Sequence, residues 1–360
     1  MLYSNINAIL NIKNKLSPKQ DVISNVPLFY RQLFTNKESY HKEFWIGRQS
    51  EIKSAENSFL RYHEGYKGAI AVLGEQGSGK SFFLNYISKT FSKNDIYQIL
   101  APESGSIDIN DFEEALSNAL PENIIRTSNP IRQFEKDSVI ILDDLELWWE
   151  KSENGNQLLE HIFDLINQYS SKYLFLVSIN SFAADLIFKL NPINNLFINI
   201  IKLRNVGSET LKEIIMLRHK SGGLKLNYKN KKINRITEAG LFNRYYKVSN
   251  GNIGFALNIW LSNIVNFENE TIYIDFENIN TFELENLKTE ELLYLLQFVL
   301  HKNLTISKLA NVMHSDKIEV VRELKFLIRS GLVQKHNRVY YLDKYMVSIT
   351  IKLLKEKGIL

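Results

Sequence analysis

Residues 69–81 read AIAVLGEQGSGKS, an apolar run that leads into a glycine-rich loop and then into the first residues of a helix. The loop has the spacing Gly74-x-x-x-x-Gly79-Lys80-Ser81, which is typical of loops that bind nucleotide phosphates. Its glycines let the backbone direct several N–H groups inward, and the following helix adds partial positive charge. We predict that Lys80 contacts the β- and γ-phosphates and that the Ser81 hydroxyl holds Mg²⁺. The predicted phosphate-binding residues are Gly74, Gly77, Ser78, Gly79, Lys80 and Ser81.

Further apolar runs alternate with helical stretches after the first strand at 69–73. They span residues 96–100, 138–142, 173–179 and 196–203. Continuous apolar strands separated by helices indicate an α/β fold, a parallel sheet with helices on both faces. From residue 204 the pattern is helical for some sixty residues, which predicts a helical lid with one strand after it, within 271–279.

These patterns divide the chain into five parts. We predict an N-terminal helical arm (1–43), a phosphate-loop ATPase core (44–204), a helical lid (205–268), a linker (269–288) and a winged helix-turn-helix domain (289–360). Pro18 and Pro27 are expected to interrupt the helices of the arm. Its aromatic segment 26–34 is expected to pack onto the rest of the protein.

Acidic residues follow the third predicted strand, in the sequence VIILDDLELWW (139–149). Asp143 comes after four apolar residues, so it is expected at the carboxyl edge of the sheet, where ligands bind. We predict that Asp143 is the second Mg²⁺ ligand. Asp144 is the candidate general base, which orients the water that attacks the γ-phosphate, and Glu146 is the alternative.

The fourth predicted strand ends in a polar residue, Asn180. In such a sheet this position lies between the phosphate loop and the acidic strand, so Asn180 is a candidate for contacting the γ-phosphate or the attacking water. Ser178 is the alternative. Equally, Asn180 could be an ordinary cap at a strand end.

At this point the chain resembles the AAA+/STAND class of P-loop ATPases. The motif GEQGSGKS is similar to the class's Walker A motif and IILDDLELW to its Walker B motif. The segment FWIGRQSEI (44–52) resembles the conserved stretch before the first strand, and SNGNIGFAL (249–257) resembles the lid motif. The resemblance implies an ATP-binding fold with Mg²⁺ as cofactor. It also implies that Ile46, Gly47 and Arg48 lie beside the adenine.

Two departures from that class concern the γ-phosphate. Gly254 stands where many AAA+ proteins carry a lid arginine. The stretch before the fifth strand contains Lys189 and no arginine, and lysine cannot make the two-pronged contact of an arginine finger. Slow hydrolysis is therefore expected, as in a regulatory switch. A nucleotide-binding assembly scaffold that scarcely hydrolyses ATP is a less favoured alternative.

The C-terminal residues form a basic winged helix-turn-helix pattern. Residues 301–360 hold twelve Lys or Arg and five Asp or Glu, whereas the whole chain has a net charge of only +4. The third helix is expected to place its apolar residues on one face and its basic residues on the other. The apolar residues are Ile318, Val321, Leu324, Leu327 and Ile328. The basic residues, with two on the wing, are Lys317, Arg322, Lys325, Arg329, Lys335 and Arg338.

This surface suits either of two partners. Its basic residues favour duplex DNA, whereas Asp316, Glu319 and Glu323 lie among them and favour a protein. A signalling or defence switch with a protein partner is the first interpretation. A DNA-directed ATPase, similar to origin-recognition or transposition regulators, is the second. Self-association on ATP binding is also expected.

Composition excludes several other classes of protein. The chain has no cysteine, so disulfides, cysteine-ligated zinc and cysteine nucleophiles are absent. Its seven histidines are scattered without the spacing of metal pairs. The first residues lack the apolar core of a signal peptide, so none is expected, and no apolar run approaches the ~20 residues of a membrane helix. A cytoplasmic location is expected, without contact to a membrane.

Overall fold

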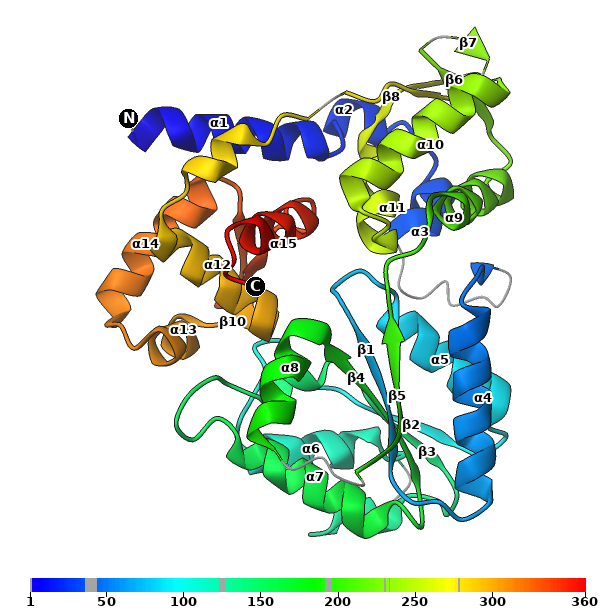
Figure 1. Ribbon diagram of the computed structural model, residues 1–360, viewed down its shortest axis with the longest axis vertical. Coiled ribbons are helices and arrows are strands. Elements are labelled where there is room, and N and C mark those ends of the chain that lie inside the picture. The colour runs from blue at the N-terminus through cyan, green and yellow to red at the C-terminus, as the bar shows by residue number, and fades with distance from the viewer. Residues whose placement is uncertain are drawn as a thin grey trace.

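The structure, a computed structural model, describes residues 2–35, 44–122, 127–191, 196–229, 231–232, 234–277 and 279–360. A five-stranded parallel sheet forms the core, in the order β2-β3-β4-β1-β5 (Figure 1). The strands are β1 (Ala69–Gly74), β2 (Ile96–Ile99), β3 (Val139–Leu142), β4 (Leu174–Asn180) and β5 (Phe197–Leu203). All five predicted strands are confirmed, so the α/β fold class is correct.

Helices cover both faces of the sheet, which explains why its strands are apolar throughout. Helices α4 (Gln49–His63) and α5 (Lys80–Phe91) cover one face, where Phe59 and Phe83 pack against Ile70. Helices α6 (Ile109–Ala119), α7 (Gln157–Tyr169) and α8 (Ser181–Leu190) cover the other face, with Trp148 buried beside α7. Because β1 lies between β4 and β5, its phosphate loop emerges at the carboxyl edge of the sheet beside the end of β4.

The lid contains three helices and an additional small sheet. The helices are α9 (Ser208–Ser221), α10 (Arg235–Ser249) and α11 (Ile253–Ser262). The strands are β6 (Lys225–Tyr228), β7 (Lys231–Lys232), β8 (Ile264–Glu268) and β9 (Thr271–Ile274), in the order β7-β6-β9-β8.

The prediction of a purely helical lid over 205–268 is therefore wrong, because β6, β7 and β8 lie within it. Strand β6 pairs in parallel with β9, far along the chain, and such pairing leaves no local pattern. The β8–β9 hairpin turns through Asn269 and Glu270, both at positive φ. Glutamate is an unusual residue in such a turn, so the sequence contained only a weak indication of the hairpin. The predicted end of the lid at residue 268 therefore falls inside this hairpin.

The C-terminal unit follows the predicted order of helices and strands. Its helices are α12 (Thr289–His301), α13 (Ile306–Met313), α14 (Lys317–Arg329) and α15 (Val347–Glu356). Strands β10 (Asn303–Leu304), β11 (Val333–His336) and β12 (Val339–Leu342) form a sheet in the order β10-β12-β11. Two residues of the predicted apolar face are exposed instead. Ile318 is 84% exposed and Ile328 is 37% exposed, whereas Val320 lies in the core with Leu324 and Leu327.

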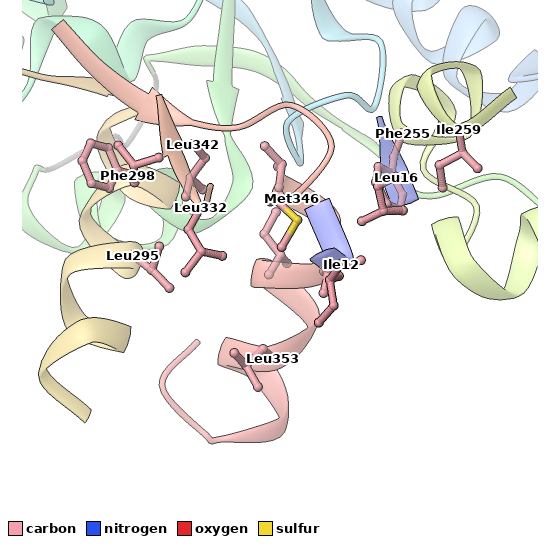
Figure 2. Close-up of a cluster of buried hydrophobic side chains, with 14 of the residues drawn as sticks. Ile12, Leu16, Phe255, Ile259, Leu295, Phe298, Leu332, Leu342, Met346 and Leu353 are labelled. Atoms are coloured by element: carbon pink, nitrogen blue, oxygen red, sulfur yellow. The ribbon is translucent and has the colours of Figure 1, made fainter. Parts of the chain in front are cut away.

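The N-terminal helices connect the lid to the C-terminal unit. They are α1 (Leu2–Leu16), α2 (Gln20–Ile23) and α3 (Leu28–Thr35), and the breaks between them fall at the two predicted prolines. Helix α1 runs from one part to the other (Figure 1). Its Ile12 and Leu16 lie between Phe255 of α11 and Met346 beside α15 (Figure 2). As expected for residues 26–34, Tyr30 is fully buried. Among the described helices, none has the length and apolar character needed to span a bilayer.

Candidate nucleotide site

A cavity of about 440 Å³ lies at the carboxyl edge of the core sheet. Residues from the N-terminal helices, the core, the lid and the C-terminal unit all line it. Among the described residues, the charged side chains on its wall are mainly cationic. They are Arg48, Lys80, Arg218, Lys302 and Lys344, with the carboxylates Asp144 and Glu146. This excess of positive charge suits a polyanionic ligand.

The phosphate loop lines this cavity with residues 76–81. Gly77 and Gly79 have φ values of 83° and 93°, a region that glycine enters without strain. Lys80 begins α5 and is only 6% exposed, and its Nζ donates to the carbonyl oxygen of Gly74 at 3.2 Å. The buried Ser78 Oγ has no hydrogen-bond partner among the described residues. Exposed donors at a helix N-terminus, a lysine and a free hydroxyl are the groups that a phosphate chain requires.

Ser178 connects the two aspartates that follow β3. Its Oγ donates to Asp143 Oδ1 and accepts from the backbone N–H of Asp144 at 2.9 Å. Asp144 is in the left-handed region, with φ 54°, and faces the cavity. Ser178 is therefore committed to orienting Asp143, which does not favour it as a γ-phosphate ligand.

Ser81 and Asp143 remain the candidate Mg²⁺ ligands. The described residues contain no cluster of three or more His, Asp or Glu side chains arranged to hold a metal ion. A hydroxyl and a carboxylate supply two oxygen ligands, and magnesium usually takes only one or two from a protein beside substrate phosphates. The residue types therefore fit this ion.

Glu146 is more closely involved in the site than its sequence position indicated. It is 1% exposed, it lines the cavity, and its Oε2 accepts from the backbone N–H of Asn180 at 3.0 Å. Burial, and then the charge of Asp144, raise the pKa of Glu146 to about 7, against the opposing effect of Lys80 and Lys302. A carboxylate whose pKa lies near neutral pH can accept a proton efficiently.

Asn180 is held by structural hydrogen bonds. Its Oδ1 caps α8 by accepting from the N–H of Phe182 at 3.0 Å, and its Nδ2 donates to the carbonyl oxygen of Val299 in α12 at 3.1 Å. Asn180 also lines the cavity. These bonds favour the strand-end cap over the predicted contact with the γ-phosphate.

The segment before α4 forms one wall of the cavity. Ile46 lines it, and Gly47 has a φ of 75°. Arg48 turns toward the loop instead of presenting a free guanidinium, and its Nη2 donates to the carbonyl oxygen of Ser78 at 2.8 Å. Trp45 stacks on Tyr86 with 4.4 Å between ring centroids. Sequence analysis missed this tryptophan, although an aromatic residue beside the expected adenine segment was a usable signal.

The lid and the C-terminal unit both reach the phosphate loop. Asn252 Nδ2 donates to the carbonyl oxygen of Gln76 at 2.8 Å. From the other side, Lys302 forms an ion pair with Asp144, and Lys355 forms one with Glu75 at 2.7 Å. Nothing in the sequence indicated these lysines, because they become neighbours of the loop only when separate parts of the chain pack together. Lys189 is exposed on α8.

Comparison with known proteins supports the fold. By sequence, the chain matches no family profile and no curated protein. The ORC1 protein of Aeropyrum pernix, solved in complex with DNA, matches with a TM-score of 0.51 at 13% identity, over 91% of this chain and 96% of that one. A Walker-type ATPase of Pyrococcus abyssi matches with a TM-score of 0.48 at 12% identity, over 89% and 99%.

A third solved structure, the RuvB branch-migration motor of Thermotoga maritima, matches with a TM-score of 0.40 at 15% identity, over 87% and 95%. The fold is thus that of the AAA+ P-loop ATPases, as the order of the core sheet and the ORC1 match both indicate. The cavity of this protein is distinguished by two lysines of the C-terminal unit, Lys302 and Lys344, which line it together with the phosphate loop.

Proposed function

We propose that this protein is an ATP-binding switch that hydrolyses ATP slowly. The observation that supports it is that a single cavity receives residues from the N-terminal helices, the core, the lid and the C-terminal unit. The loop residue Gly77, the lid residue Asn252 and Lys302 of the C-terminal unit all line it. A nucleotide bound there would contact all of these parts, so a change at the γ-phosphate would change how they pack.

The chemistry assigned to the site is attack of water on the γ-phosphorus of ATP. Asp144 orients the water and receives its proton, with Glu146 as the alternative base. The bond between the γ-phosphorus and the bridging oxygen breaks, so ADP leaves with the electron pair of that bond. Mg²⁺, held by Ser81 and Asp143, would offset the negative charge that develops on the phosphates. Lys80 binds the β- and γ-phosphates, and Ile46 with Trp45 borders the base.

Slow turnover follows from the kind of cations available. The arginines on the cavity wall are Arg48 and Arg218, among the described residues. Arg48 is bonded to Ser78, and Arg218 lies over the ring of Phe44 at 5.5 Å. The cations that remain to contact the γ-phosphate are lysines, which are compact point charges without the planar fork of arginine.

The output surface of this switch is assigned to the C-terminal unit, with a protein as partner. On α14 the guanidinium of Arg322 is bonded to Glu319 at 3.1 Å and to Glu323 at 3.0 Å. Its charge is thereby offset, which makes it a poor phosphate contact. The exposed Ile318 beside it offers an apolar contact that suits a protein surface.

Duplex DNA is the second candidate partner. Exposed basic residues remain on α14 and on the β11–β12 hairpin: Lys317, Lys325, Arg329, Lys335 and Arg338. The matched ORC1 protein was solved with DNA. Both observations favour a DNA-directed ATPase.

Spin labels can test the switch directly, since the chain has no cysteine of its own. Asp164→Cys on α7 and Lys325→Cys on α14 place two exposed labels on the core and the C-terminal unit. The distance between the labels should differ between the ATP-bound and ADP-bound protein. A pair within the core, Asp164→Cys with Lys89→Cys, should give one distance in both states. Equal distances for the first pair, at nucleotide concentrations shown to saturate the site, would contradict the switch.

A further inference from the structure

Lys302 enters the nucleotide cavity from the C-terminal unit, although it lies 158 residues after its partner Asp144. It follows the last residue of α12 and has a φ of 65°, a backbone conformation that lysine rarely adopts. That conformation costs free energy, so the surrounding packing must maintain it.

Neighbours on both sides of Lys302 attach it to the core. His301 stacks on Trp149 with 4.8 Å between ring centroids, and both side chains are buried. Asn303 Nδ2 donates to the carbonyl oxygen of Glu103 at 2.8 Å. One turn earlier in α12, Val299 accepts from Asn180. These contacts fix the end of α12 against the core, so the position of the Lys302 side chain is built into the fold.

The charge environment keeps Lys302 cationic. Burial alone would lower its pKa, yet the carboxylates of Asp144, Glu146 and Asp143 raise the pKa above its usual value. Its ammonium carries three N–H donors. Among the described residues Asp144 is the acceptor that it contacts, so the other N–H groups can bond a second acceptor in the cavity that Lys302 shares with Lys80 and Ser81.

We propose that Lys302 binds the terminal phosphate of a nucleoside triphosphate from within the same chain, and so acts where other ATPases use an arginine from a neighbour. This inference rests on the proposed ATP site and adds a residue to it. The ammonium keeps its bond to Asp144 and donates to an oxygen of the γ-phosphate. ADP lacks that phosphate, so Lys302 has no such contact with ADP.

The consequence is that the C-terminal unit senses which nucleotide is bound. In the ATP-bound protein the γ-phosphate connects Lys302, at the end of α12, to the phosphate loop. In the ADP-bound protein this connection is missing. Because binding energies are reciprocal, whatever pulls the C-terminal unit from the core must also weaken ATP relative to ADP.

The test compares three variants of the full chain. Equilibrium affinities for ATP and ADP, measured by calorimetry, and single-turnover hydrolysis are the two readouts. In Lys302→Ala, ATP affinity should fall ~10-fold to 100-fold, as expected for a lost hydrogen bond to a charged group, while ADP affinity stays the same. Hydrolysis should slow as well. Lys302→Arg should recover much of the ATP affinity and of the rate of hydrolysis, since it keeps the positive charge.

Lys308→Ala is the matched control. Lys308 of α13 pairs with the buried Glu150 of the core at 3.4 Å, at the same interface but outside the nucleotide cavity. The contacts of the end of α12 with the core do not involve Lys308 and remain in this variant, so the ratio of ATP to ADP affinity should stay unchanged. An unchanged ratio in Lys302→Ala, faster hydrolysis in that variant, or an equal loss in Lys308→Ala would overturn the proposal. A wild-type chain that binds no ATP would instead overturn the proposed function itself.

Discussion

The backbone N–H of Gly254 donates to the carbonyl oxygen of Gly77 at 2.9 Å, so helix α11 of the lid begins directly on the phosphate loop. A Cβ added at Gly254 would lie 2.9 Å from the Cα of Gly77. The absence of a lid arginine at this position therefore has a steric reason. With α11 this close to the loop backbone, a residue with any side chain at 254 would push the two apart.

The first prediction concerns this contact. Gly254→Ala should force α11 off the loop and lower ATP affinity about tenfold, because the loop loses the bonds from Gly254 and Asn252 that shape it. Calorimetric titration with ATP measures the effect. Gly240→Ala is the control, since a Cβ there meets nothing within 4 Å. It should raise the free energy of unfolding by roughly 1 kcal/mol, as alanine favours a helix over glycine. Unaltered ATP affinity in Gly254→Ala would show that the lid opens before ATP binds.

Removal of the loop lysine is the second prediction. Lys80→Ala should abolish the rise in melting temperature that ATP causes, while the melting temperature without nucleotide stays near that of the wild type. ATP at 100 times its Kd should stabilise the wild type by ~2.7 kcal/mol, which is easily seen by thermal unfolding. Lys89→Ala, on the exposed side of the same helix, should behave as wild type. Retained stabilisation by ATP in Lys80→Ala would show that the loop is not part of the nucleotide site.

The carboxylates supply the third prediction. Asp144→Asn should keep ATP binding and lower the rate of hydrolysis by ~10²–10⁴-fold, the usual effect of removing a positioned base. Asp143→Asn should in addition weaken binding that depends on Mg²⁺. Rates from phosphate release, with affinities measured in parallel, separate the two effects. Should Asp144→Asn hydrolyse ATP at the normal rate and Glu146→Gln not, Glu146 is the base.

The fourth prediction is a pH dependence of stability. Trp260 Nε1 donates to the Tyr30 hydroxyl at 2.9 Å, and that hydroxyl lies 2.8 Å from His219 Nδ1, which joins α3 to the lid. Burial favours the neutral form of His219, and a neutral ring whose Nδ1 carries no proton can accept from the Tyr30 hydroxyl. Burial, with a smaller effect of Lys220, lowers the pKa of His219 to about 4, from ~6.5 in the unfolded chain.

The unfolded chain then binds more protons than the folded one between these two pKa values. The contribution of His219 to stability is complete above pH ~6.5 and declines by ~1.4 kcal/mol per pH unit as the pH falls toward 4. Denaturant unfolding at pH 7, 6 and 5 measures the slope. His219→Gln cannot take up the proton, so its stability at pH 7 should be lower and its slope smaller. Equal slopes in both proteins would exclude His219 as the cause.

The partner of the C-terminal unit is the subject of the fifth prediction. If the partner is a protein, binding to duplex DNA should be weak, and Lys325→Ala, Arg329→Ala and Arg338→Ala combined should scarcely change it. A lid variant with the same charge change, at Lys225, Lys229 and Lys247, is the control, and all six side chains are exposed. Gel shifts over a range of salt give the result. Tight DNA binding whose salt slope falls by ~0.9 per lost contact in the first variant alone would establish DNA as the partner.

The sequence by itself determined the parts of this protein that depend on neighbours in the chain. The five core strands and the phosphate loop were predictable because apolar runs and glycine spacing act locally on the backbone. The same holds for the order of elements in the C-terminal unit. The position of Asp143 and Asp144 was predictable because an acidic residue directly after a buried strand must emerge at the edge of the sheet.

Only the tertiary structure decided what meets those local elements. Strand β6 finds its partner in β9, the cap Asn180 reaches α12, and Lys302 enters the cavity beside Asp144. None of these contacts leaves a periodic pattern, because each one joins residues whose distance is set by the packing of whole helices and sheets. Hydrophobic burial brings the parts together without regard to direction, and the charges that then face one another determine the chemistry of the site.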